Sequence, residues 1–139
     1  MRLDPDCVRD LLLFIEDMDT YVLDKDNDLT LQGAFLETIS QKLPQYPETQ
    51  LYYTLDKLEE GGLVNMTSQW GGDTLTSCHV SSLTYAGHEF LASIRDGGQW
   101  DVVKTGLSAV KNYSLTAIAA IAEGITSGAV SAYLGSLKH

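Results

Sequence analysis

The sequence has few basic residues. Nine Lys and Arg stand against 19 Asp and Glu, which gives a formal net charge of -10. The shortage runs through most of the chain: residues 1–28 hold three bases against nine acids, 29–62 hold two against five, and 63–96 hold one against three. A protein that binds DNA through its phosphates needs Lys and Arg on the contacting surface, because counterion release supplies most of the non-specific affinity. The charge therefore disfavours nucleic acid as a partner.

Cysteine and histidine are also scarce. The two cysteines, Cys7 and Cys78, are far apart in the sequence, and the N-terminal segment lacks the basic-then-apolar layout of a signal peptide. We therefore expect a reduced, cytoplasmic protein. Cys7, Cys78, His79 and His88 do not show the close spacing that places two zinc ligands on one turn, so we expect small buried cysteines and no metal site.

The side-chain combinations used in catalysis are missing as well. A nucleophilic Ser or Cys needs a nearby base and an orienting acid, but the chain has only three histidines and no glycine-flanked serine of the elbow type. Many acids lie in runs such as Asp24, Asp26 and Asp28, where a solvated surface is the simplest interpretation. No phosphate-binding G-x-x-x-x-G-K-S/T motif is present. We expect no enzymatic activity and no cofactor.

What the chain does contain is the pattern of one globular domain. Its 139 residues are 44% hydrophobic and 20% charged, which is ordinary for a chain that buries a single core. Apolar residues recur at helical spacing in 5–20, 33–43 and 48–60. Asp4 and Pro5 suit a helix start, Pro44 a helix end, and Gly61 and Gly62 the end of the third helix. Residues 23–28 read as a loop, and 29–31 as a short strand that pairs with a later hairpin.

The second half of the chain predicts a hairpin followed by helices. Residues 63–70 and 74–82 are rich in residues typical of strands and are joined through Gly71, Gly72 and Asp73. The residues expected on the inner face of this hairpin are Val64, Met66, Thr76, Cys78 and Val80. Thr84 can cap a helix that ends at the Asp96-Gly97-Gly98 segment, and a further helix spans about 99–111, with Val110 on its buried stripe. Ser114 can cap a last helix.

This order of elements predicts a mainly α, α+β fold: a winged helix-turn-helix with a two- or three-stranded wing sheet and two additional C-terminal helices. Residues 1–96 would form the winged-helix domain, and 97–139 a helical extension for packing or dimerisation. Small residues line one face of the last helix and favour a homodimer over membrane insertion, because Glu123 and several hydroxyl residues interrupt its apolar run. The candidate dimerisation residues are Ala119, Ala122, Gly124, Gly128 and Ala132.

Helix 48–60 would be the recognition helix of such a fold. It carries four acids and one lysine, Lys57, and the predicted wing from 68 to 74 has no base. Its aromatic residues suit a protein interface, although one or two of them could simply close the core. The candidate partner-binding residues are Gln50, Tyr52, Tyr53, Asp56, Glu60 and Trp70.

Three segments carry a resemblance to a known family: MRLDPDCVRDLLLFIE, LDKLEEGGLV and LTYAGHEFLASIRDGGQW. With them the chain resembles the bacterial and phage domain of unknown function family 2513. The resemblance implies a winged-helix fold and a frequent prophage setting, and it implies no activity. Members commonly have a Tyr-His pair in the third helix, where this chain has Tyr52 and Tyr53.

Three functional hypotheses follow. The first is a non-catalytic winged-helix protein, phage- or prophage-encoded, that binds a macromolecule through an acidic surface. The second is a DNA-binding transcriptional regulator that presents helix 48–60 to an operator. The third is a phage inhibitor that occupies the basic groove of a host nucleic-acid-binding or defence protein. The charge favours a protein partner over DNA.

Overall fold

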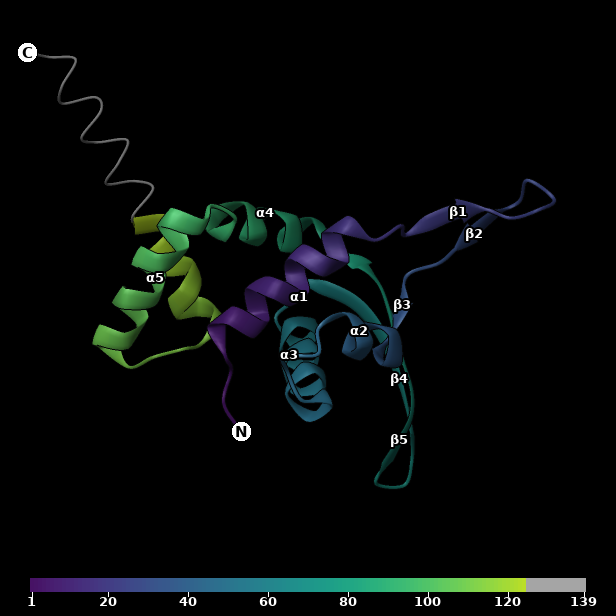
Figure 1. Cartoon of the computed structure of the whole chain (residues 1–139), viewed down its shortest axis with the longest axis horizontal. Coiled ribbons are helices and arrows are strands. Elements are labelled where there is room, and N and C mark those ends of the chain that lie inside the picture. The colour runs from purple at the N-terminus through teal and green to yellow at the C-terminus, as the bar shows by residue number, and fades with distance from the viewer. Residues whose placement is uncertain (125–139) are drawn as a thin grey trace, which may run out of the picture.

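The computed structural model describes residues 1–124, and it confirms a mixed α+β fold (Figure 1). Helix α1 (Pro5–Asp17) lies at the centre, with α2 (Leu36–Lys42) and α3 (Glu48–Glu60) on one side and α4 (Tyr85–Ile94) on the other. Strands β4 (Val64–Gly71) and β5 (Thr74–Leu83) flank the helices, while α5 (Gly97–Val110) lies at the opposite end of the molecule. The order α2, α3, hairpin, α4 is consistent with the predicted winged helix.

Helix α1 begins where the sequence predicts. The Asp4 Oδ1 atom accepts a hydrogen bond from the Asp6 N–H at 3.0 Å, and Pro5 occupies the first turn, where its missing N–H costs nothing. The helix ends at Asp17, three residues before the expected end, because the chain leaves it to form strand β1 (Tyr21–Leu23). Its buried stripe consists of Cys7, Val8, Leu11, Leu12 and Ile15.

Helices α2 and α3 differ in how closely they follow the sequence pattern. Helix α3 has the predicted bounds and buries Leu51, Leu55 and Leu58. Helix α2 begins at Leu36 and not at residue 33, because Gly33 adopts a φ of 61° and the next two residues form strand β3 (Ala34–Phe35). A Cβ atom at Gly33 would lie 2.2 Å from the Val80 carbonyl oxygen, so this backbone approach requires glycine.

The main sheet has three antiparallel strands in the order β3-β5-β4. Two predictions about it are wrong. Strand β2 (Leu29–Leu31) pairs with β1 and not with the hairpin, whose third strand is β3. Thr76 is exposed and not on the inner face, because the register shifts between Gln69 and Trp70 so that Trp70 pairs with Leu75. The bulge turns Leu75 inward in place of Thr76.

Strands β1 and β2 form a separate two-stranded ribbon, here called the arm, which projects from the body of the molecule (Figure 1). The predicted loop over 23–28 is therefore mostly the turn of this hairpin, in which the Asp24 Oδ1 atom accepts hydrogen bonds from the N–H groups of Asp26 and Asp28. Cross-strand pairs place four large apolar side chains on one face of the arm, and all of them are exposed: Tyr21, Leu23, Leu29 and Leu31.

Three side-chain caps begin the C-terminal helices. Thr84 Oγ1 accepts a hydrogen bond from the Gly87 N–H, as predicted. Asp96 caps the start of α5 through the Gln99 N–H at 2.9 Å, so the Asp96-Gly97-Gly98 segment begins a helix where the sequence pattern suggested only an end. The prediction that Val110 is buried is wrong, because its side chain is exposed. Residues 115–124 are helical, and the Ser114 hydroxyl caps them through the Ala117 N–H.

One hydrophobic core joins these elements. The Trp100 indole N–H donates to the Asp6 carboxylate at 2.9 Å, and Lys104 pairs with the same carboxylate, so α5 is tied directly to α1. Side chains from both sides of residue 96 share the core, including Leu11, Leu55, Leu107 and Ile118. No helix within residues 1–124 is long and apolar enough to cross a membrane.

Candidate functional site

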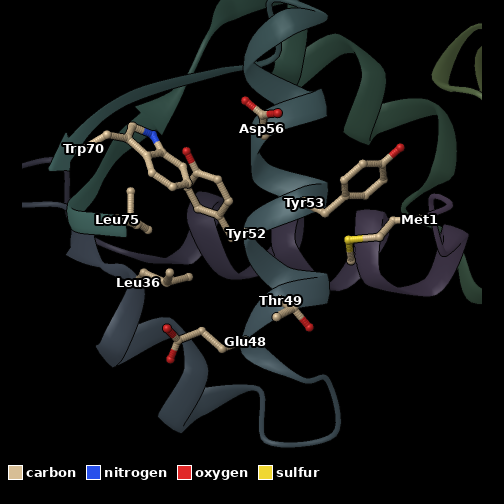
Figure 2. Close-up of a pocket in the computed structure, with 9 residues that line it drawn as sticks. All are labelled: Met1, Leu36, Glu48, Thr49, Tyr52, Tyr53, Asp56, Trp70 and Leu75. Carbon is tan, nitrogen blue, oxygen red and sulfur yellow. The ribbon is translucent and has the colours of Figure 1, made fainter. Parts of the chain in front are cut away.

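A groove of about 480 Å³ runs along the exposed face of α3, between the β4–β5 hairpin and the N-terminus (Figure 2). Tyr52 and Trp70 lie on one side of the helix, and Tyr53 and Met1 lie on the other. The groove is lined by Met1, Leu36, Glu48, Thr49, Tyr52, Tyr53, Asp56, Trp70 and Leu75. Its volume falls in the range of ligand-binding pockets, roughly 300–1,000 Å³.

Two aromatic rings form the best-defined wall of the groove. Tyr52 and Trp70 meet edge to face, with ring centroids 5.8 Å apart and an angle of 75° between the planes. The Tyr52 hydroxyl donates a hydrogen bond to Ser68 Oγ at 3.1 Å, which holds the helix residue against strand β4. Trp70 nevertheless stays 53% exposed. The wall is therefore held in place while one ring remains open to solvent.

The charges along α3 are distributed unevenly. The only lysine of the helix, Lys57, forms an ion pair with Glu60 at 3.1 Å and lies 5.5 Å from the centre of the Tyr53 ring. The hydrogen bond that Lys57 donates to the Glu60 carboxylate raises the pKa of Lys57 above its usual value. Glu48 and Asp56, which line the groove, form no ion pair within residues 1–124. The groove therefore carries two carboxylates that have no ion-pair partner among the described residues.

Four of the six predicted partner-binding residues meet at the groove, namely Tyr52, Tyr53, Asp56 and Trp70. Gln50 does not line it. Its side-chain amide donates to the Arg2 carbonyl oxygen at 3.1 Å and to Thr54 Oγ1 at 3.3 Å. Glu60 is outside the groove as well and pairs with Lys57.

The other residues that line the groove were not predicted from the sequence. Glu48 could have been found, because it lies one helical turn before Tyr52 and so shares its face. Leu75 could not, because a bulge decides that this residue and not Thr76 turns inward. Leu36 belongs to the start of α2, whose position next to α3 depends on the short strand before it.

The predicted dimerisation residues have different surroundings. Ala122 is 1% exposed and belongs to the chain's own hydrophobic core. Ala119 lines a hollow against α4 that also includes Phe90. Gly124 is exposed, and apart from its own helix and chain neighbours no atom of the described residues lies within 4 Å of the position of a Cβ. Gly128 and Ala132 lie outside the described residues.

Titratable groups elsewhere do not assemble a second site in residues 1–124. Cys7 and Cys78 are both buried, as expected, and burial raises the pKa of the Cys7 thiol to about 11 and that of Cys78 above its usual value. These thiols stay protonated at neutral pH and are shielded from reagents. The carboxylates of Asp24, Asp26 and Asp28 lie within 4.8 Å of one another on the surface, an arrangement that is common without an ion.

Comparison with known proteins gives one match. The sequence model of a family described as hypothetical protein (DUF2513) matches residues 2–114, which is most of the chain and includes α1 to α5. No curated protein and no solved structure matches the chain. The matched range contains every residue that lines the groove except Met1.

Proposed function

The chain belongs to the family described as hypothetical protein (DUF2513), and we propose that it is a non-catalytic winged-helix module that binds a basic protein partner. The partner would contact α3 and the β4–β5 hairpin. One observation carries the proposal: this face combines a fixed pair of aromatic rings with unpaired carboxylates, while its lysine is already neutralised by Glu60. Interfaces are enriched in exposed aromatic residues of this kind.

The same charges argue against DNA as the partner of this face. Glu48, Asp56, Glu59 and Glu60 all belong to α3, and the turn of the hairpin adds Asp73 without a Lys or Arg. Carboxylates that face phosphates repel them, and at low ionic strength that repulsion is screened least. A transcriptional regulator that reads an operator with this helix is therefore the less favoured alternative.

The family resemblance suggests where such a module would act. A phage or prophage protein with an acidic interaction face can occupy the basic nucleic-acid-binding surface of a host protein in the cytoplasm. An electrostatic match of this type raises the association rate and selects basic partners. This setting is part of the proposal, and the genes that neighbour the coding sequence would support or weaken it.

Affinity capture from a host lysate tests the proposal. We expect the tagged full chain to retain a basic protein, and the triple variant Asp56→Lys, Glu59→Lys, Glu60→Lys to lose it. The matched control reverses three exposed acids outside this face, Glu89, Asp101 and Glu123, and should keep the partner. Equal capture by the two triple variants would show that this face does not bind.

A DNA titration tests the alternative. We expect no binding of the wild-type chain to duplex DNA even at low ionic strength, where attraction between a basic protein and phosphate would be strongest. Fluorescence anisotropy of a labelled duplex provides the measurement. Saturable binding that the triple variant on α3 changes would favour the regulator over the protein-binding module.

A further inference from the structure

We infer that the groove on α3 is a binding site for an arginine side chain, held by the Tyr52 and Trp70 rings and by the carboxylates of Glu48 and Asp56. The inference rests on the proposed function and deepens it, because it names the chemical group of the partner that enters the groove. The occupant would be an arginine in an extended segment of a basic protein.

The shape and polarity of the groove fit an arginine side chain. Its aromatic wall and the apolar Leu36 and Leu75 can cover the aliphatic stem of a long side chain, which buries methylene groups readily. The exposed part of Trp70 gives a flat surface at the rim (Figure 2). A guanidinium is planar and stacks on aromatic rings, and it is more weakly hydrated than an ammonium group, so it leaves water at a lower cost.

The charge of the groove fits an arginine as well. Among residues 1–124, the charged side chains that line the groove are those of Glu48 and Asp56, and both are acidic. They lie eight residues apart on α3, which corresponds to about 12 Å along the helix axis. Figure 2 shows them below and above the Tyr52 ring. A cation at the aromatic wall therefore has a carboxylate on each side, and either can accept hydrogen bonds from a guanidinium.

The same helix already holds a cation on an aromatic ring. The Lys57 ammonium lies 5.5 Å from the centre of the Tyr53 ring while it pairs with Glu60. This arrangement of ring, cation and carboxylate is satisfied within the chain. Tyr52, Trp70 and Asp56 offer the same two components, ring and carboxylate, and within residues 1–124 no cation forms an ion pair with Asp56. An aromatic ring and a carboxylate together attract a cation more strongly than either alone.

An NMR titration of the full chain tests the inference. The probe is the capped tripeptide acetyl-Gly-Arg-Gly-amide, and the matched control peptide has citrulline, which has nearly the same shape without the charge. The chain has two tryptophans, so each indole N–H gives one signal. We expect the Trp70 signal to shift saturably with the arginine peptide only, while the signal of buried Trp100 stays in place.

Variants identify the carboxylates. Asp56→Asn and Glu48→Gln should each weaken binding about twofold to fivefold, the size expected when one partly exposed charge is removed. Glu59→Gln removes the same charge from the same helix outside the groove and should change the affinity less than the other two. Trp70→Leu removes the indole reporter, so binding is followed through the backbone amide signals of Tyr52 and Asp56, and their saturable shifts should be lost. The fold of each variant is checked by its amide spectrum.

Several results would overturn the inference. They are an unmoved Trp70 signal at millimolar peptide, equal shifts with the citrulline peptide, or an effect of Glu59→Gln as large as that of Asp56→Asn. Equal affinity for a lysine peptide would overturn the assignment of arginine. None of these results would change the outcome expected of the lysate capture, because the variant used there reverses the charges of Glu59 and Glu60 in addition to that of Asp56. The inference and the proposed function can therefore fail separately.

Discussion

At the scale of single residues, close backbone contacts require glycine at positions where composition alone would allow other residues. Gly87 is the clearest case within the described chain. It is buried in the first turn of α4, and a Cβ atom there would lie 2.0 Å from the Leu63 carbonyl oxygen. That carbonyl also accepts the Thr84 N–H at 3.0 Å. The start of α4 is therefore in direct backbone contact with Leu63, the residue that precedes β4.

We predict that Gly87→Ala destabilises the protein by about 1–3 kcal/mol, the usual cost of forcing an extra methyl group into a packed site. The backbone at Gly87 and that at Leu63 must move apart to admit the methyl group, which also strains the Thr84 cap. Urea unfolding followed by circular dichroism measures the effect. Gly97→Ala is the matched control, since Gly97 begins α5 and a Cβ there would meet no atom of the described chain within 4 Å. A stable Gly87→Ala variant would show that the contact can relax.

At the scale of elements, the sequence predicted the parts that local chemistry determines. Asp4, Thr84 and Ser114 cap helices as expected, and α3 has the predicted bounds. The elements that were predicted wrongly depend on contacts between residues that are far apart in the sequence. Strand β2 has the expected residues but a different partner, because only the fold decides which edge is near.

The candidate site was predictable to a similar extent. Aromatic and acidic residues on the exposed face of α3 follow from helical periodicity, which identified Tyr52, Tyr53 and Asp56. Leu75 lines the groove because of a bulge in the hairpin, and Leu36 lines it because of how α2 packs beside α3. Neither is visible in the spacing of apolar residues.

The turn of the arm gives a testable prediction for a single element. Asp24 accepts hydrogen bonds from two backbone N–H groups in its turn, whereas the Asp26 carboxylate accepts none within residues 1–124. We predict that Asp24→Ala weakens the arm by about 1 kcal/mol, the typical value of such hydrogen bonds, and that Asp26→Ala does not. Hydrogen exchange of the Val22 and Thr30 amides reports the local change. Global stability should stay nearly constant, because the arm adds nothing to the buried core.

Unchanged exchange rates in Asp24→Ala would mean that the Asp24 hydrogen bonds contribute little to holding the arm. An isolated two-stranded ribbon is marginally stable in water, so that result would indicate an additional contact along the arm.

At the scale of the whole molecule, the residues after position 96 take part in the central core. Trp100, Val103, Leu107, Ile118 and Ala122 are all buried. A large apolar side chain contributes roughly 1.5–3 kcal/mol when it is fully buried, whereas a domain is stable by only about 5–15 kcal/mol. Segments 1–96 and 97–124 therefore depend on each other for stability.

We predict that the fragment 1–96 shows no cooperative thermal unfolding, because it loses more burial than its stability allows. Trp100→Ala is a milder test in the full chain and should cost about 3–5 kcal/mol, including the hydrogen bond to Asp6. Calorimetry measures both. Val102→Ala is the control on the same helix, since Val102 is 54% exposed. A fragment 1–96 that melts at the wild-type temperature would contradict the shared core.

The apolar face of the arm has a consequence for how the molecules behave toward one another. Four uncovered large side chains at the end of a projecting ribbon would make neighbouring molecules adhere in a neutral protein. Here the net charge of -10 makes the molecules repel one another. This repulsion disappears near the isoelectric point, which is about pH 4.4 for this sequence. The acidic composition therefore opposes association through the apolar face of the arm, and we expect the solubility of the protein to be lowest near pH 4.4.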